Sequence, residues 1–241
     1  MILAINTSTL DFSLAFQKED GSVLGECFMA KSGGHFRNLM PVLDFLVSKS
    51  DFEIHDVKCI IIAIGPGSFT GLRSGISVAK GLCQALDVPI IGISSLEALA
   101  SRIPFSDFPV VPILDSRKGE VFIAKFIREK DNNLVRCMDD NSIKIKAFAT
   151  ICDEPALFIG NDFEIQGPQI KKNLGAMAML APAQYWNLKA SAVGSLGIKR
   201  FNAGDYDDPY NLSPIYLRRP DIRTSQSLIS GLKSSIRNNL S

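Results

Sequence analysis

The chain has 241 residues, of which 46% are hydrophobic and 21% are charged, so it is long and apolar enough to fold around a sizeable core. This composition excludes an intrinsically disordered chain. The formal net charge of +1 argues against a protein that grips RNA over many phosphates, because such proteins usually carry a basic excess. If the chain acts on RNA, we expect it to rely on a partner, although near-neutrality does not say which partner.

Cysteine usage and hydropathy indicate a cytoplasmic protein. The five cysteines form an odd number without a Cys-x-x-Cys spacing, and Cys59 and Cys83 lie in apolar stretches. Reduced, buried thiols fit this pattern better than disulfides or a zinc site. The N-terminus does not resemble a secretory signal, and no apolar run approaches the roughly 20 residues that span a bilayer.

The first half of the chain predicts three strands followed by alternating helices and strands. The expected strands are 2–5, 11–17, 23–29, 58–64 and 89–93, and the expected helices are 35–49, 70–86 and one that begins at a cap at 94–97. This order indicates a mixed sheet with helices packed on it.

A proline-rich stretch at 104–112 is the expected boundary between two lobes. The elements expected around and beyond it are strands at 110–114, 120–127, 134–138 and 156–160 and a helix at 186–201. We therefore expect an N-terminal lobe at 1–103, a C-terminal lobe at 104–220 and a polar tail at 221–241.

The segment Gly65-Pro66-Gly67-Ser68-Phe69-Thr70-Gly71 joins a buried strand to a helix, where backbone N–H groups and the helix dipole can bind an anion. A Walker A loop needs Lys and then Ser or Thr after its last glycine, whereas Leu72-Arg73 follows here. A dinucleotide-binding loop needs glycine where Thr70 stands, and no acidic residue ends the next strand. A structural turn is the simpler interpretation, with phosphate binding as the alternative.

Two features predict an exposed helical interface. Gly71, Gly75 and Ala79 recur every four residues, which lets another element approach one face of the 70–86 helix closely. That element is either a partner's helix or the protein's own sheet, and the sequence leaves both open. The helix at 35–49 is apolar over more than a single stripe, so one face can cover the sheet while another binds a partner.

Other catalytic patterns are weak. Ser68 lacks the Gly-x-Ser-x-Gly register of a serine hydrolase, and only His35 and His55 are available as a base. Asp115 and Glu120 flank a turn and form a candidate carboxylate pair, but a β-hairpin is the simpler explanation.

The block GPGSFTGLRSGISVAKGL at 65–82 resembles the signature of the TsaB (YeaZ) family. Supporting similarities are ILAINTST at the start, GGHFRNLMPVLDFL at 33–46, GISSLEALA at 92–100, DSRKGEVF at 115–122 and PIYLR at 214–218, so the resemblance covers nearly the whole chain. It implies an α/β fold with two lobes of the ASKHA (actin-like, sugar-kinase-like) type, in which mixed sheets are flanked by helices.

The resemblance also implies a function. TsaB proteins are similar in fold to the catalytic subunit TsaD, have a degenerate active site and bind TsaD through their first two helices. With the ATPase TsaE they support transfer of a threonylcarbamoyl group to the tRNA adenosine next to the anticodon. The expectation is a non-catalytic, cytoplasmic subunit without membrane contact. Its partners would be TsaD and TsaE, with a homodimer as an alternative assembly, tRNA reached through the complex, and ATP bound at that complex and not by this chain alone.

Carried onto this sequence, the implied partner interface comprises His35, Phe36, Leu39, Met40, Leu43, Leu46, Gly71, Leu72, Arg73, Gly75, Ile76, Ala79 and Leu82. A degenerate nucleotide loop would comprise Asn6, Thr7, Ser8, Gly65, Gly67 and Ser68.

No catalytic residue and no metal ligand is expected. The family usually has Asp where this chain has Asn6, and a neutral amide is a poorer ligand for a hard cation. The His-x-x-x-His pair of TsaD-type enzymes is broken, because Leu39 stands four positions after His35. The alternative function is an ASKHA-fold ATPase or phosphotransferase that is active in its own right.

Overall fold

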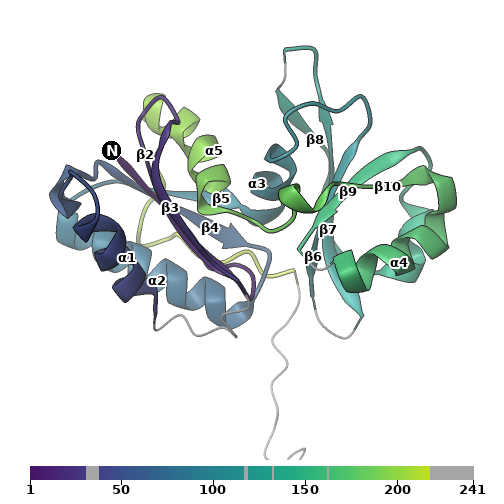
Figure 1. The fold of residues 1–241 in the computed structure, drawn as a ribbon, viewed down its shortest axis with the longest axis horizontal. Helices are drawn as coiled ribbons and strands as arrows, with labels where there is room; N and C mark the ends of the chain where they lie inside the picture. Colours follow the sequence, from purple (N-terminus) through teal and green to yellow (C-terminus); the bar gives the residue numbers. More distant parts are fainter. Residues whose placement is uncertain (31–37, 117–118, 132, 162, 218–241) are drawn as a thin grey trace, which may run out of the picture.

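The computed structural model describes residues 1–30, 38–116, 119–131, 133–161 and 163–217 (Figure 1). Its strands are β1 (Ile2–Asn6), β2 (Phe12–Gln17), β3 (Val23–Met29), β4 (Cys59–Gly65), β5 (Ile90–Ser94), β6 (Val110–Asp115), β7 (Glu120–Arg128), β8 (Leu134–Lys144), β9 (Ala156–Gly160) and β10 (Ala178–Leu180). Its α-helices are α1 (Leu39–Ser48), α2 (Phe69–Leu86), α3 (Ser95–Ser101), α4 (Phe163–Leu174) and α5 (Ala190–Asn202). Short 3-10 helices lie at Ile54–Asp56, Ile145–Thr150, Gly175–Met177 and Ala183–Tyr185.

The first lobe is built on a five-stranded sheet in the order β3-β2-β1-β4-β5. β1, β2 and β3 form an antiparallel meander, whereas β4 and β5 run parallel to β1. Every residue of β1 is buried, which explains its continuous apolar sequence, because a central strand covered on both faces has no solvent side.

Helices cover both faces of this sheet (Figure 1). α1 and α2 pack on the face that carries Leu3 and Ile60, and α5 packs on the opposite face with Ala4 and Ile61. Neighbouring residues such as Leu3 and Ala4 lie on opposite faces of the sheet because the side chains of a strand alternate with a period of two residues. α5 lies close to the sheet because Gly197 has no side chain; a β-carbon there would run into Ile61.

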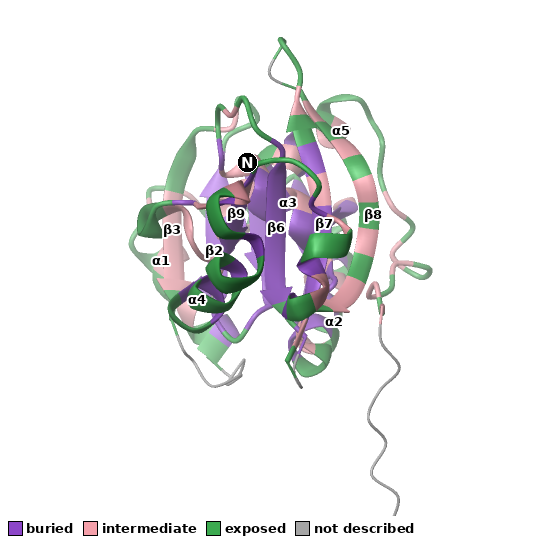
Figure 2. Ribbon diagram, turned by 90° about the vertical axis from the view of Figure 1, so that its right-hand side faces the viewer, coloured by how far each residue is buried: buried purple, intermediate pink, exposed green. Residues whose placement is uncertain are grey.

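The second lobe repeats this topology in a sheet of order β10-β9-β6-β7-β8. β6, β7 and β8 form an antiparallel meander, and β9 and β10 add in parallel, as β4 and β5 do in the first lobe. Figure 2 shows β6 buried for most of its length and the edge strand β8 alternating between intermediate and exposed residues. The doubled meander-plus-parallel topology confirms the predicted two-lobed α/β fold of the ASKHA type.

The structure differs from the prediction at α4 and β10, which the sequence did not predict, in the longer β8 and at the start of α5. The sequence did not predict α4, because Gly167 and Pro168 inside it lower its helix propensity. α5 begins at Ala190 and not at 186, since Asn187 has a left-handed backbone with φ 69° that a helix cannot contain. α1 is described from Leu39, so its expected start at 35 lies outside the described residues.

The proline-rich segment at 104–112 joins the two sheets, but the chain later returns to the first one. α5 lies within the range expected for the C-terminal lobe, yet it packs on β1, β2 and β4 of the first sheet. The polar tail at 221–241 lies outside the described residues. No helix in the described part of the chain is both long and apolar enough to cross a membrane.

Candidate functional site

The end of β1 is fixed by the side chain of its last residue. Asn6 is fully buried, and its Oδ1 accepts hydrogen bonds from the backbone N of Ser8 at 3.0 Å and from the Oγ of Ser8 at 2.7 Å. Its Nδ2 donates to the carbonyl oxygen of Leu188 at 2.9 Å. The amide thus links the turn after β1 to the segment before α5. The hydrogen bond to Leu188 needs a donor, which an ionised carboxylate does not have.

The glycine-rich turn before α2 packs directly on this segment. The backbone N of Ser68 donates to the carbonyl oxygen of Ser8 at 2.7 Å, and a β-carbon at Gly67 would overlap that same oxygen. Gly65 has φ +109°, and a β-carbon there would lie 2.9 Å from the carbonyl oxygen of Ile215. The glycines therefore serve close packing of one backbone on another.

The predicted nucleotide loop is brought together by contacts among its own members. Asn6, Thr7 and Ser8 are buried, and Gly67 and Ser68 lie against them. A phosphate at such a place needs free backbone N–H donors, but those of Ser8 and Ser68 donate within the protein. The backbone N–H groups of Ser8 and Ser68 are therefore not free to bind a phosphate between the two segments. In the described ranges, no three His, Cys, Asp or Glu side chains are grouped to hold a metal ion.

One face of α2 packs inside the chain. Gly71, Gly75, Ala79 and Cys83 follow one another at four-residue spacing, and all are buried. A β-carbon at Gly75 would overlap the Oγ1 of Thr7. Burial also raises the pKa of the Cys83 thiol. We call these four residues the inner row.

Another face of α2 is open to solvent. Arg73, Ser77, Gly81 and Ala85 repeat at the same spacing, and all are exposed. A β-carbon at Gly81 would meet nothing within 4 Å. We call these four residues the outer row. Because three of them are small, another helix could approach the backbone of α2 closely along this row.

α1 has the two-sided character that its sequence predicts. Leu39 and Leu43 are buried in the core shared with α2, whereas 47% of Met40 and 54% of Phe45 are exposed. α1 and α2 cover the same face of the first sheet, on the side of this lobe away from the second lobe (Figure 1). Their exposed sides therefore point outward from the same side of the molecule. We call them together the outward surface.

The predicted interface residues lie in several environments. His35 and Phe36 lie outside the described residues, Met40 and Arg73 are exposed, and Leu46 and Leu82 are intermediate. The predicted interface residues that are buried within this chain are Leu39, Leu43, Gly71, Leu72, Gly75, Ile76 and Ala79.

The small-residue stripe therefore packs on the protein's own first sheet, and assigning it to a partner was wrong. The exposed residues of α1 and α2 that the prediction omitted include Phe45, Ser77, Gly81 and Ala85. Ser77, Gly81 and Ala85 follow Arg73 at four-residue intervals, so helical periodicity could have placed them on the same face as Arg73.

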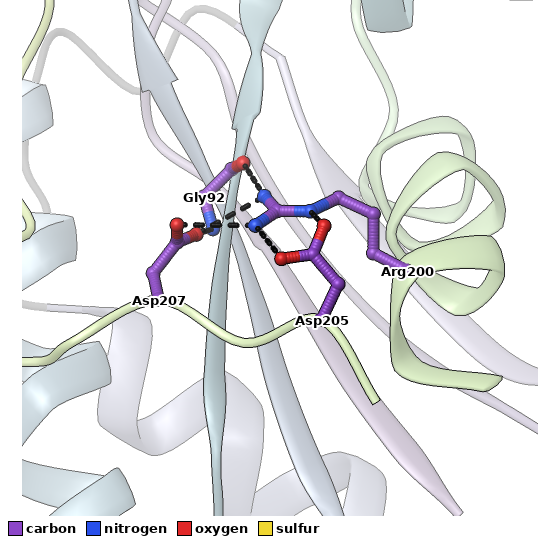
Figure 3. Close-up of polar contacts among 4 residues, drawn as sticks. All are labelled: Gly92, Arg200, Asp205 and Asp207. Atoms are coloured by element: carbon purple, nitrogen blue, oxygen red, sulfur yellow. Dashed lines mark hydrogen bonds and ion pairs between the residues drawn. The ribbon is translucent and has the colours of Figure 1, made fainter. Parts of the chain in front are cut away.

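Residues 203–217, which we call the C-terminal strap, run back over the first lobe. The guanidinium of Arg200 donates to the carboxylates of Asp205 and Asp207 and to the carbonyl oxygen of Gly92 (Figure 3). Asp207 in turn accepts from the backbone N of Gly92 at 2.7 Å, and its own N donates to Ile90 in the edge strand β5. Hydrogen bonds to the two aspartates raise the pKa of Arg200, and the same guanidinium lowers the pKa of Asp205. We call these hydrogen bonds of Arg200 with Asp205, Asp207 and Gly92 the Arg200 clasp. The sequence did not predict it.

The class of the protein follows from the fold and from a family match. Residues 29–203 match the model of the TsaD family, described as tRNA N6-adenosine threonylcarbamoyltransferase. The structure of YeaZ from Pseudomonas aeruginosa aligns with a TM-score of 0.73 and 23% identity over 90% of this chain and 99% of that chain, which shows a shared fold. The chain is a two-lobed ASKHA-fold protein related to TsaD.

Close relatives identify the particular family. The tRNA threonylcarbamoyladenosine biosynthesis protein TsaB of Bacillus subtilis (strain 168) is 32% identical over 220 residues, which are 90% of this chain and 93% of the relative. The TsaB protein of Escherichia coli (strain K12) is 33% identical over 132 residues, 54% of this chain and 56% of the relative. The chain belongs to the TsaB family.

Proposed function

We propose that the chain is a non-catalytic subunit for tRNA threonylcarbamoyladenosine biosynthesis, which binds and activates TsaD and acts with TsaE. The observation that carries the proposal is the outward surface, on which Met40 and Phe45 of α1 and the small outer row of α2 are exposed over the same face of the first sheet. A helical partner can bury exposed apolar side chains and can pack closely on a helix face of small residues. The relationship to the TsaD and TsaB families supports the choice of partner.

The first sheet supports the non-catalytic part of the proposal. The segments around Asn6 and Gly67 are packed on each other, so we assign ATP use and threonylcarbamoyl transfer to TsaD and TsaE. The formal net charge of +1 agrees with tRNA being reached through the complex, and we assign this role to the cytoplasm. Magnesium-dependent ATP turnover by the purified chain, surviving repurification, would contradict this part.

The test is complex formation with TsaD from the same organism, measured by light scattering and titration calorimetry. We expect a stable heteromeric complex for the wild type and at least about tenfold weaker binding for Phe45→Ser, which removes an exposed aromatic anchor. The matched control is Phe105→Ser, since Phe105 is also exposed but lies in the segment between the lobes. No complex, with or without TsaE and ATP, would refute the proposal. The chain alone could also form a dimer. If Phe45→Ser dissociates that dimer, the same surface also pairs two copies of the chain.

A further inference from the structure

The C-terminal strap reaches the first turns of α2, where three side chains contact one another. The ring centroids of Tyr216 and Phe69 are 5.3 Å apart, and the guanidinium carbon of Arg73 lies 4.3 Å from the ring centroid of Phe69. The Nε of Arg73 donates to the hydroxyl of Tyr216 at 3.1 Å. We call these three residues the anchor cluster. It joins residues that are far apart in the sequence.

The anchor cluster stays at the surface although its members hold one another. Phe69 is 38% exposed and Tyr216 is 42% exposed. Rings that served only to fasten the strap would gain more by being buried. Tyr, Phe and Arg are the side chains enriched at the centres of protein interfaces. Side chains already ordered by mutual contact also lose less entropy when a partner covers them.

The charge around the cluster indicates the chemistry of that partner. The first turn of α2 contains no acidic residue and is capped by the neutral hydroxyl of Ser68, so no carboxylate of that turn neutralises the positive end of its helix dipole. Within the described ranges, no carboxylate forms an ion pair with Arg73. A complementary surface would present apolar side chains bordered by a carboxylate.

The strap is held firmly enough to fix the position of Tyr216. Next to it, the backbone N of Ile215 donates to the carbonyl oxygen of Ile64 at 2.8 Å. Further back, Leu212 packs over Gly92, where a β-carbon would lie 2.8 Å from its Cδ1. The Arg200 clasp of Figure 3 holds the start of the strap on the same strand. Tyr216 is therefore positioned before any partner arrives.

We propose that the anchor cluster is a binding hot spot for TsaD, in which Tyr216 of the strap completes the outward surface. The cluster is continuous with that surface, because Arg73 belongs both to the cluster and to the outer row. This inference rests on the proposed function. The inference adds to the proposed function a contact residue, Tyr216, that lies outside the two helices. It also specifies the surface of TsaD that would bind there, namely apolar side chains beside a carboxylate.

The experiment is titration of the full chain with TsaD, with thermal unfolding of each variant alone. Tyr216→Ala should weaken binding by about tenfold or more, because it removes an anchor ring. Tyr216→Phe should weaken it by a few-fold, because only the hydroxyl that holds Arg73 is lost. The matched control is Tyr210→Ala, since Tyr210 lies in the same strap and is 91% exposed. It should bind as the wild type does. Tyr210→Ala and Tyr216→Phe should unfold near the wild-type temperature, and Tyr216→Ala should unfold only a few degrees lower, because it loses one aromatic contact.

The outcomes separate this inference from the proposed function. If Phe45→Ser weakens binding and Tyr216→Ala does not, the hot spot is refuted and the proposed function stands. If the wild type forms no complex with TsaD, both are refuted. If Tyr216→Ala leaves TsaD affinity unchanged but lowers the affinity of the assembled complex for tRNA, the cluster binds RNA and the protein hot spot is wrong.

Discussion

The inner and outer rows of α2 contain similar small residues at the same four-residue spacing but meet different surroundings. Gly75 in the inner row lies against Thr7, and a β-carbon there would overlap that side chain. Gly81 in the outer row has nothing within 4 Å of the position of a β-carbon. Recurring small residues on a helix thus indicate that something approaches closely, whereas the rest of the fold decides what approaches.

The largest effect should come from enlarging the inner row. Gly75→Leu would force a side chain against Thr7, just after β1, and we expect it to lower the free energy of unfolding by about 3 kcal/mol or more. Urea unfolding followed by circular dichroism measures this. A Gly75→Leu chain that keeps wild-type stability but no longer binds TsaD would reverse our assignment of the two rows.

Thiol labelling compares the two rows directly. Ser77→Cys adds a thiol to the outer row, while Cys83 is the native thiol of the inner row. Burial raises the pKa of Cys83, so less of it is thiolate at pH 8, and access to it is restricted as well. We expect the cysteine at position 77 to be alkylated at least about tenfold faster than Cys83. We also expect the alkylation rate of Cys83 to reach its maximum at a higher pH than the rate at position 77.

The same labelling should respond to the partner at one position only. Saturating TsaD should slow alkylation at position 77 and leave Cys83 unchanged, with each site quantified by peptide mass spectrometry. Protection of Cys83 alone would place the contact elsewhere on the helix.

The smallest expected effect is on stability at the outer row. Gly81→Ala should raise the free energy of unfolding by about 0.5–1 kcal/mol, because alanine loses less backbone entropy in a helix and its β-carbon meets open space. Chemical denaturation measures the change. A decrease would mean that Gly81 already has a close neighbour in the isolated chain.

Much of the fold could be predicted because its patterns are local. The buried strands at 2–5 and 58–64 and the helix at 70–86 follow from continuous or periodic apolar residues. α4 was missed because Gly167 and Pro168 are helix breakers by local propensity, yet Ile170 and Leu174 of that helix are buried in the second core. Tertiary packing there outweighs propensity.

The candidate site was less predictable because its contacts are distant in sequence. Asn6 could be singled out because the resembled family usually has Asp at that position, but its hydrogen bond to Leu188 could not be predicted. Helical periodicity divides α2 into rows without saying which row faces the sheet. The cluster of Phe69 with Tyr216 depends on a strap that returns after the whole second lobe.

The central claim, that TsaD binds the outer row, is tested most directly by titrating TsaD with the Gly81→Leu variant. The leucine side chain enters open space in the isolated chain, so the free energy of unfolding should stay the same or rise. It would stand where a partner helix must approach, so we expect the dissociation constant to rise by about a hundredfold or more. Wild-type affinity of Gly81→Leu for TsaD would contradict the account.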